Sequence, residues 1–233
     1  MEIARTMKFL ADIAANNNRT WYAEHKNEYL AVRADFENAV SKAIVRIAKE
    51  DPSIAHLSVK DVTYRFCHDT RFSPDKSPYK RHFGAYIAAH GKNALHGGYY
   101  IHVEPGQCHL SGGIYWLPTN ILNACRNEIM GNIEEWRRRV ENDKFVSLFG
   151  RPGEGTWETS KRGFGLNLLK TCPSGFPRDY EFIEYLRMKD YCCWHAVDDN
   201  FFHGDGWLDA MTDVFKTAKP MMDFINGVVD DYE

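Results

Sequence analysis

The residues best suited to chemistry lie in one short segment, residues 64–81. It holds five basic side chains against two acidic ones, which gives it a local charge of +3. Cations this close together repel one another unless carboxylates or a bound anion offset their charge. Arginine can hold a phosphate or a carboxylate through two hydrogen bonds, so it suits direct contact with an anion. We therefore predict an anion-binding site built from Arg65, Arg71, Lys76 and Lys80.

Three further residues are candidates for proton transfer at such a site. Asp69 lies between the two arginines and can orient one of them, or act as a general base if a reaction takes place. Tyr79 and His102 can donate a proton or a hydrogen bond. These assignments leave open whether the protein is an enzyme and whether it uses a cofactor.

Two other interpretations of the basic segment stay open. In one, Asp69 and Asp75 form ion pairs with the arginines of a rigid loop, although an exposed ion pair contributes only about 0–1 kcal/mol. In the other, the basic loop or the polar face of the sheet docks an acidic partner without catalysis. A ligand site needs a concavity with converging polar groups, whereas a docking surface is flatter and larger.

Histidines are concentrated in the middle of the chain, where six of the ten fall between residues 68 and 109. The sequence Glu104-Pro105-Gly106-Gln107 has the Pro-Gly centre of a type II turn. A tight hairpin around this turn places His102 opposite His109, with Glu104 on the same face, and opposed Cβ atoms lie about 4.5–5.5 Å apart. A metal ion bound by His102, His109 and Glu104 is therefore a minor alternative, although the chain has no HExxH spacing.

Hydrophobic periodicity predicts a mixture of helices and strands. The helical pattern marks residues 3–14, a long helix capped by Thr20 that ends at Asp51, a helix after Pro118, residues 179–188, and a last helix capped by Asp205. Alternating patterns predict strands over 61–67, 82–90, 97–104, 166–170 and 190–197, the last of them central in the sheet. The expected fold is α+β in a single domain over residues 1–233: a mainly antiparallel sheet, a β-meander plus later strands, packed with N-terminal, central and C-terminal helices.

The composition argues against several classes of protein. The chain of 233 residues has a net charge of −3 and no apolar run near the ~18–20 residues that span a bilayer. We therefore expect no membrane segment and no nucleic-acid partner, since nucleic-acid-binding domains tend to be basic. Six cysteines without a CxxC spacing, and an N-terminus unlike a signal peptide, favour a reduced protein in the cytoplasm. The expected partner is an anionic small molecule, and the oligomeric state is open.

One string in the basic segment resembles a known family. Arg65, followed by Asp69-x-Arg71-Phe72-Ser73-x-Asp75-Lys76-Ser77-Pro78-Tyr79-Lys80, is similar to the DUF2461 family of conserved proteins with no established function. The resemblance covers nearly the whole chain and includes residues 16–22, 98–106 and 112–118. His68 stands where members of the family commonly have arginine. The resemblance implies one compact domain of bacterial type, and it supplies no catalytic residue.

Overall fold

The computed structural model describes residues 1–69, 71, 74–154, 160–204 and 206–232 of the chain. The helix cap expected at Asp205 lies outside these residues. The chain forms two compact units. The first comprises Met1–Lys92, Tyr100–His109 and Val197–Thr212, and the second comprises Asn93–Tyr99, Leu110–Ala196 and Asp213–Glu233.

The described residues form α-helices, one short 3-10 helix and strands. The helices are α1 (Ile3–Ala15), α2 (Arg19–Glu24), α3 (Lys26–Ile47), η1 (Pro52–Ile54), α4 (Val59–Val62), α5 (Thr119–Gly131), α6 (Ile133–Val140), α7 (Asp143–Phe149), α8 (Ile183–Arg187) and α9 (Trp207–Asp230). The strands are β1 (Phe83–Ile87), β2 (Gly98–Val103), β3 (His109–Ile114), β4 (Arg162–Phe164) and β5 (Tyr191–Ala196). The predicted α+β fold is confirmed.

The strands form one antiparallel sheet in the order β1-β2-β3-β5-β4. β5 lies between β3 and β4, which confirms its predicted central position. β2 and β3 are consecutive in the chain and form the predicted hairpin. At its turn, the amide of Gln107 donates to the carbonyl of Glu104 at 2.9 Å, and Gly106 has a φ of +73°. A positive φ at the third residue is what a type II turn requires, and glycine adopts it without strain.

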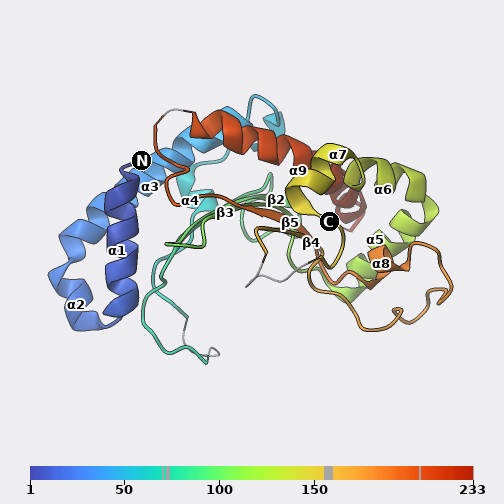
Figure 1. The fold of residues 1–233 in the computed structure, drawn as a ribbon, viewed down its shortest axis with the longest axis horizontal. Helices are drawn as coiled ribbons and strands as arrows, with labels where there is room; N and C mark the ends of the chain where they lie inside the picture. Colours follow the sequence, from blue (N-terminus) through green and yellow to red (C-terminus); the bar gives the residue numbers. More distant parts are fainter. Residues whose placement is uncertain (70, 72–73, 155–159, 205, 233) are drawn as a thin grey trace. The chain divides into compact units, whose positions relative to one another are not determined.

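Helices α1, α2 and α3, in blue in Figure 1, lie next to one another in the first unit. Asn18 caps α2 because its side chain accepts the amide of Trp21 at 2.9 Å. The single long helix predicted from Thr20 to Asp51 is instead divided at His25 into α2 and α3. The core of this unit is aromatic. The ring of Phe36 on α3 packs 5.2 Å from that of Phe83 on β1, and Phe9 on α1 packs against Phe66.

The strand predicted over residues 61–67 is wrong. The chain there begins with α4, whose first turn is closed by a capping box in which Ser58 and Asp61 satisfy each other's groups. This local hydrogen bonding outweighs the alternating apolar pattern. Beyond the helix, extended pairing is limited to isolated bridges at Thr63 with Ala85 and at Cys67 with Tyr79.

The second unit packs around Trp136, which is fully buried on α6. Its ring meets Tyr185 of α8 and Tyr191 of β5 edge-on, at centroid distances of 5.9 and 5.7 Å. The strand predicted over 166–170 is wrong, since this segment contributes only an isolated bridge between Leu168 and Met188. Residues 162–164 form the neighbouring strand β4 instead, pairing with β5.

Across the described residues, none of the helices has both the length and the apolar character needed to span a bilayer. All six cysteines are free thiols.

Candidate functional site

The basic segment folds back on itself as an irregular hairpin in the first unit. The amide of His68 donates to the carbonyl of Pro78 at 2.9 Å, and the amide of Lys80 donates to the carbonyl of Phe66 at 3.0 Å. Asp75 stabilises the loop because it accepts hydrogen bonds from the amide and the hydroxyl of Ser77. The two backbone hydrogen bonds hold residues 66–68 against residues 78–80, although these residues form no regular strands.

Asp69 occupies the centre of the arginine pair. The guanidinium of Arg71 grips it with two hydrogen bonds, Nε to Oδ1 at 3.0 Å and Nη2 to Oδ2 at 2.8 Å. Arg65 adds a longer contact at 3.3 Å. The hydrogen bonds from Arg71, with the charges of both arginines, hold the pKa of Asp69 well below its usual range. The side chains of Arg65 and Arg71 are exposed, at 70% and 76%, respectively. Both are paired with the carboxylate of Asp69.

The two lysines of the segment have different environments. Lys76 is exposed. Lys80 is half-buried, and its Nζ lies 5.2 Å from the centre of the Tyr64 ring. Burial lowers the pKa of Lys80, and the positive charges of Arg65 and Arg33 lower it further. Among the described residues, no carboxylate pairs with the Lys80 ammonium group.

Tyr79 belongs to the aromatic core of the first unit. It is buried, its ring stacks on Tyr22 at 4.2 Å, and burial raises its pKa. The side chain of Asn17 holds its backbone by accepting the Tyr79 amide and donating to the Tyr79 carbonyl. The structure therefore places Tyr79 in a packing position, apart from the ion pairs of Asp69.

The residues from the hairpin form a second polar group, also in the first unit. His102 and His109 are neighbours, as the turn predicted: their rings stack 4.4 Å apart with an interplanar angle of 17°. His102 is buried and makes two hydrogen bonds: its Nε2 lies 2.9 Å from Oε2 of Glu104, and the hydroxyl of Tyr100 lies 2.9 Å from its Nδ1. The hydrogen bond from His102 and nearby positive charges lower the pKa of Glu104, outweighing burial, which acts in the opposite direction.

These contacts fix the protons of the group. The ionised carboxylate of Glu104 only accepts, so Nε2 of His102 carries the hydrogen. When the imidazole of His102 is neutral, Nδ1 is the acceptor, and the Tyr100 hydroxyl donates to it. Burial raises the pKa of Tyr100, so this phenol keeps its proton at neutral pH. Tyr100, His102 and Glu104 form a continuous hydrogen-bonded row along β2 and its turn.

His82 completes this group, and the sequence analysis missed it. Its Nδ1 lies 3.9 Å from Oε2 of Glu104, and its ring lies 4.5 Å from that of His102. Burial lowers the pKa of His82 to about 4, assisted by the charges of His102 and Lys80. No spacing in the sequence indicates this contact, because His82 precedes β1 and its approach to Glu104 depends on the pairing of β1 with β2.

We call His82, Tyr100, His102, Glu104 and His109 the hairpin cluster. Within it, His82, His102 and Glu104 each offer one ligand atom, and these atoms all lie within 4.8 Å of one another. Burial lowers the pKa of His109 to about 4 as well, so the imidazoles of His82 and His109 are neutral at pH 7. A neutral imidazole has a lone pair for a metal ion or a proton.

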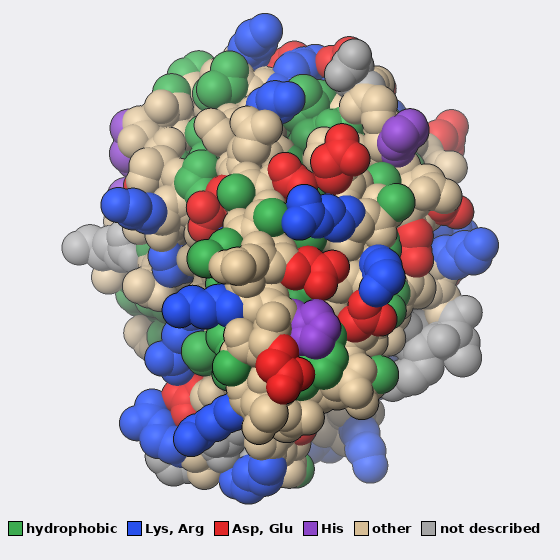
Figure 2. Space-filling model, turned by 90° about the vertical axis from the view of Figure 1, so that its left-hand side faces the viewer, with side chains coloured by type: hydrophobic (Ala, Val, Ile, Leu, Met, Phe, Trp, Pro, Cys, Tyr) green, Lys and Arg blue, Asp and Glu red, His purple; other side chains and the backbone are tan. Residues whose placement is uncertain are grey.

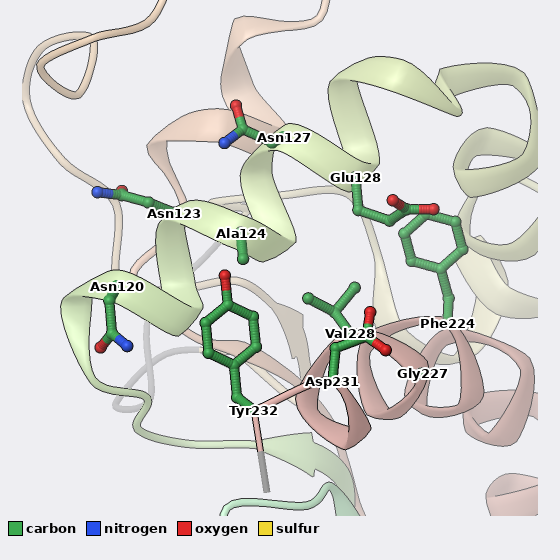
Figure 3. Close-up of a pocket in the computed structure, with 10 residues that line it drawn as sticks. All are labelled: Asn120, Asn123, Ala124, Asn127, Glu128, Phe224, Gly227, Val228, Asp231 and Tyr232. Atoms are coloured by element: carbon green, nitrogen blue, oxygen red, sulfur yellow. The ribbon is translucent and has the colours of Figure 1, made fainter.

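A hollow of about 670 Å³ lies in the second unit, between α5 and the C-terminal end of α9 (Figure 3). Its lining includes the amides of Asn120, Asn123 and Asn127 and the carboxylates of Glu128 and Asp231. None of the residues that line it is basic. An anion would therefore meet only acidic charge there, and no residue predicted from the sequence contributes to it.

Figure 2 shows the face of the molecule on the side of α1 and α2. Lys and Arg side chains, in blue, lie close to Asp and Glu side chains, in red, over most of this face. At the lower left of this view, blue side chains gather with few red ones among them.

The chain belongs to the DUF2461 family. The family model, described as a conserved hypothetical protein, matches residues 5–224 and so confirms the resemblance seen in the sequence. No curated protein and no solved structure matches the chain significantly. The family assigns no activity, so the functional argument rests on the site itself.

Proposed function

We propose that this protein binds a small anionic ligand, carrying a phosphate or a carboxylate, at the ammonium group of Lys80. Arg65 assists from the opposite side of the folded basic segment, and Arg71 and Lys76 contribute only long-range charge. The observation that carries the proposal is the half-buried state of Lys80 beside cationic neighbours.

Partial burial of a cation costs free energy because the protein replaces part of its hydration shell. Proteins normally offset that cost by pairing the buried cation with a carboxylate. Near Lys80 the charged groups that act on its pKa are Arg65 and Arg33, which add to the cost. Cations whose pKa is lowered by burial and by neighbouring positive charges are candidates for binding sites.

The surroundings of Lys80 also suit a ligand with an aromatic or planar part. The Tyr64 ring lies beside the ammonium group, and its own pKa is raised by burial. Arg33 is anchored away from solvent through Glu37 at 2.7 Å and through the carbonyl of Tyr64 at 3.0 Å. This arrangement holds the Tyr64 backbone in place, so that the site is preorganised.

Binding is tested by isothermal titration and thermal unfolding with two probes, inorganic phosphate and malonate, in a buffer containing EDTA. A ligand at 100 times its Kd stabilises the folded state by about 2.7 kcal/mol. We expect this stabilisation in the wild type and in Lys76→Met, which removes an exposed lysine of the same segment, and its loss in Lys80→Met. Absence of binding by either probe in the wild type, or equal binding by Lys80→Met, refutes the proposal.

Enzymatic activity is not part of this proposal. If an acidic protein rather than a small molecule is the partner, neither probe will bind to the wild type, and the anion site at Lys80 is refuted.

The expected compartment remains the cytoplasm, and the free thiols are consistent with a reducing environment.

A further inference from the structure

We propose that His82, His102 and Glu104 bind a divalent transition-metal ion such as Zn²⁺, with Tyr100 orienting the imidazole of His102. This site is separate from the Lys80 anion site, and neither proposal depends on the other. It also differs from the metal set expected from the sequence, because His82 replaces His109 as a ligand.

The spacing of the ligand atoms fits a small tetrahedral ion. Ligands about 2.0–2.1 Å from Zn²⁺ lie about 3.3 Å from one another in that geometry. Oε2 of Glu104 lies 2.9 Å from Nε2 of His102 and 3.9 Å from Nδ1 of His82, which brackets this value. All three donor atoms lie within 4.8 Å of one another, so modest side-chain rotations bring them around the ion.

The donor set matches known metal chemistry. Two imidazoles and one carboxylate are the ligands of catalytic zinc sites with an open fourth position, and they also suit other divalent first-row metals. His102 and Glu104 are largely buried, at 11% and 14% side-chain exposure, which limits competition from water.

A second shell is already in place. A metal-bound imidazole usually donates its other N–H group to an oxygen, which fixes the orientation of the ring. Here the Tyr100 hydroxyl lies 2.9 Å from Nδ1 of His102. With the ion on Nε2 of His102, the hydrogen of the imidazole lies on Nδ1 and is donated to the oxygen of Tyr100. His109 supports the same ring by stacking on its face.

The charges that face the cluster favour an ion with an open position. Glu104 is the single carboxylate of the set, so a bound dication keeps a net charge of +1. Arg81 lies 3.8 Å from Oε1 of Glu104, and Lys80 acts on His82. Both cations oppose a metal ion, but Arg81 is 59% exposed and solvent screens it. The net positive charge predicts water, hydroxide or an anion as the fourth ligand.

The test uses Co²⁺ as a spectroscopic probe and Zn²⁺ as a competitor, with full-length protein purified without a histidine tag and kept free of phosphate. We expect one Co²⁺ per chain, a visible absorption band, and its loss when Zn²⁺ is added. His82→Gln and Glu104→Gln should each weaken binding by at least about tenfold, and Tyr100→Phe by about 10–100-fold. His203→Gln, at an exposed position, is the matched control and should bind as the wild type does.

Because His82 is partly exposed, His82→Gln should disturb folding less than the other variants do. Circular dichroism will show whether this variant is folded. A wild type that binds less than one tenth of an equivalent of Co²⁺ at about 100 μM free metal overturns the proposal. That free metal concentration is far above the Kd expected of a resident metal site. Equal affinity in the wild type, His82→Gln and Glu104→Gln overturns it as well. Since the anion titrations contain EDTA, failure of this site leaves the Lys80 result unchanged.

Discussion

The hydroxyl of Tyr100 on β2 reaches Nδ1 of His102 by passing over Gly84 on the neighbouring strand β1. A Cβ atom on Gly84 would lie 2.6 Å from that hydroxyl and 3.1 Å from the nearest ring carbon. The hydrogen bond between Tyr100 and His102 therefore depends on the absence of a side chain on β1. Glycine in a strand often marks such a close approach.

Gly84→Ala should displace the Tyr100 ring and break its hydrogen bond to His102. Overpacking of a buried position destabilises a protein by about 1–3 kcal/mol, and we expect a loss in this range in urea unfolding. Co²⁺ affinity should fall together with stability because Tyr100 no longer orients His102. Gly131→Ala is the control, since an added Cβ there meets no atom within 4 Å. Equal stability of Gly84→Ala and the control would show that Tyr100 can move without cost.

Lys80→Met should increase the free energy of unfolding at pH 7. The lowered pKa means that the folded state binds the Lys80 proton less well than the unfolded state does. Below both pKa values that difference destabilises the fold in full, and it disappears as the pH rises through the folded value towards about 10.4. Methionine fills a similar volume without charge. Urea unfolding at pH 7 and pH 10 should show a stabilisation by the substitution that becomes smaller at the higher pH, and destabilisation at pH 7 would contradict the burial argument.

Arg71→Ala should leave anion binding nearly unchanged, although Arg71 belongs to the set predicted from the sequence. Its guanidinium is exposed and already paired with Asp69. Surface substitutions of this kind change the free energy by within about ±0.5 kcal/mol, which corresponds to roughly a twofold change in affinity. Titration with phosphate decides the point. A tenfold loss in Arg71→Ala would mean that the ligand displaces Asp69 and takes the arginine pair instead.

Anion affinity should decrease at high pH earlier than an ordinary lysine would allow. The ammonium group attracts the anion only while it is protonated, and its pKa lies below the usual value. Phosphate binding measured from pH 7 to pH 11 should therefore fall before the pH reaches about 10.4. Malonate, which does not change charge over this range, serves as the control for the titration of phosphate itself. A constant malonate affinity up to pH 10.5 contradicts the assignment of Lys80.

The elements set by local chemistry were predictable from the sequence. The Pro105-Gly106 turn fixes the β2–β3 hairpin, and with it the contact between His102 and His109. His82 could not be placed because its approach to Glu104 depends on the pairing of β1 with β2, which joins residues distant in the sequence. The strand predicted over residues 61–67 was wrong for a local reason. The capping box of Ser58 and Asp61 favours a helix there in spite of the alternating apolar pattern.

The basic segment shows where charge counting alone was insufficient. Five cations in eighteen residues indicated convergence on an anion. In the structure Asp69 supplies that anion for Arg65 and Arg71, and Lys80 turns towards Tyr64 instead. Which cation stays without a carboxylate depends on side-chain placement, and no spacing in the sequence reveals it.

The most direct test is the pKa of Lys80 itself, followed by NMR of the lysine side-chain resonances and assigned by the signal missing in Lys80→Met. In EDTA-treated protein without added anion, we predict a pKa below about 10.4 that rises when phosphate is added, because a bound anion favours the charged form. A pKa at the ordinary value, unchanged by phosphate, would contradict the proposal that Lys80 is the anion-binding residue.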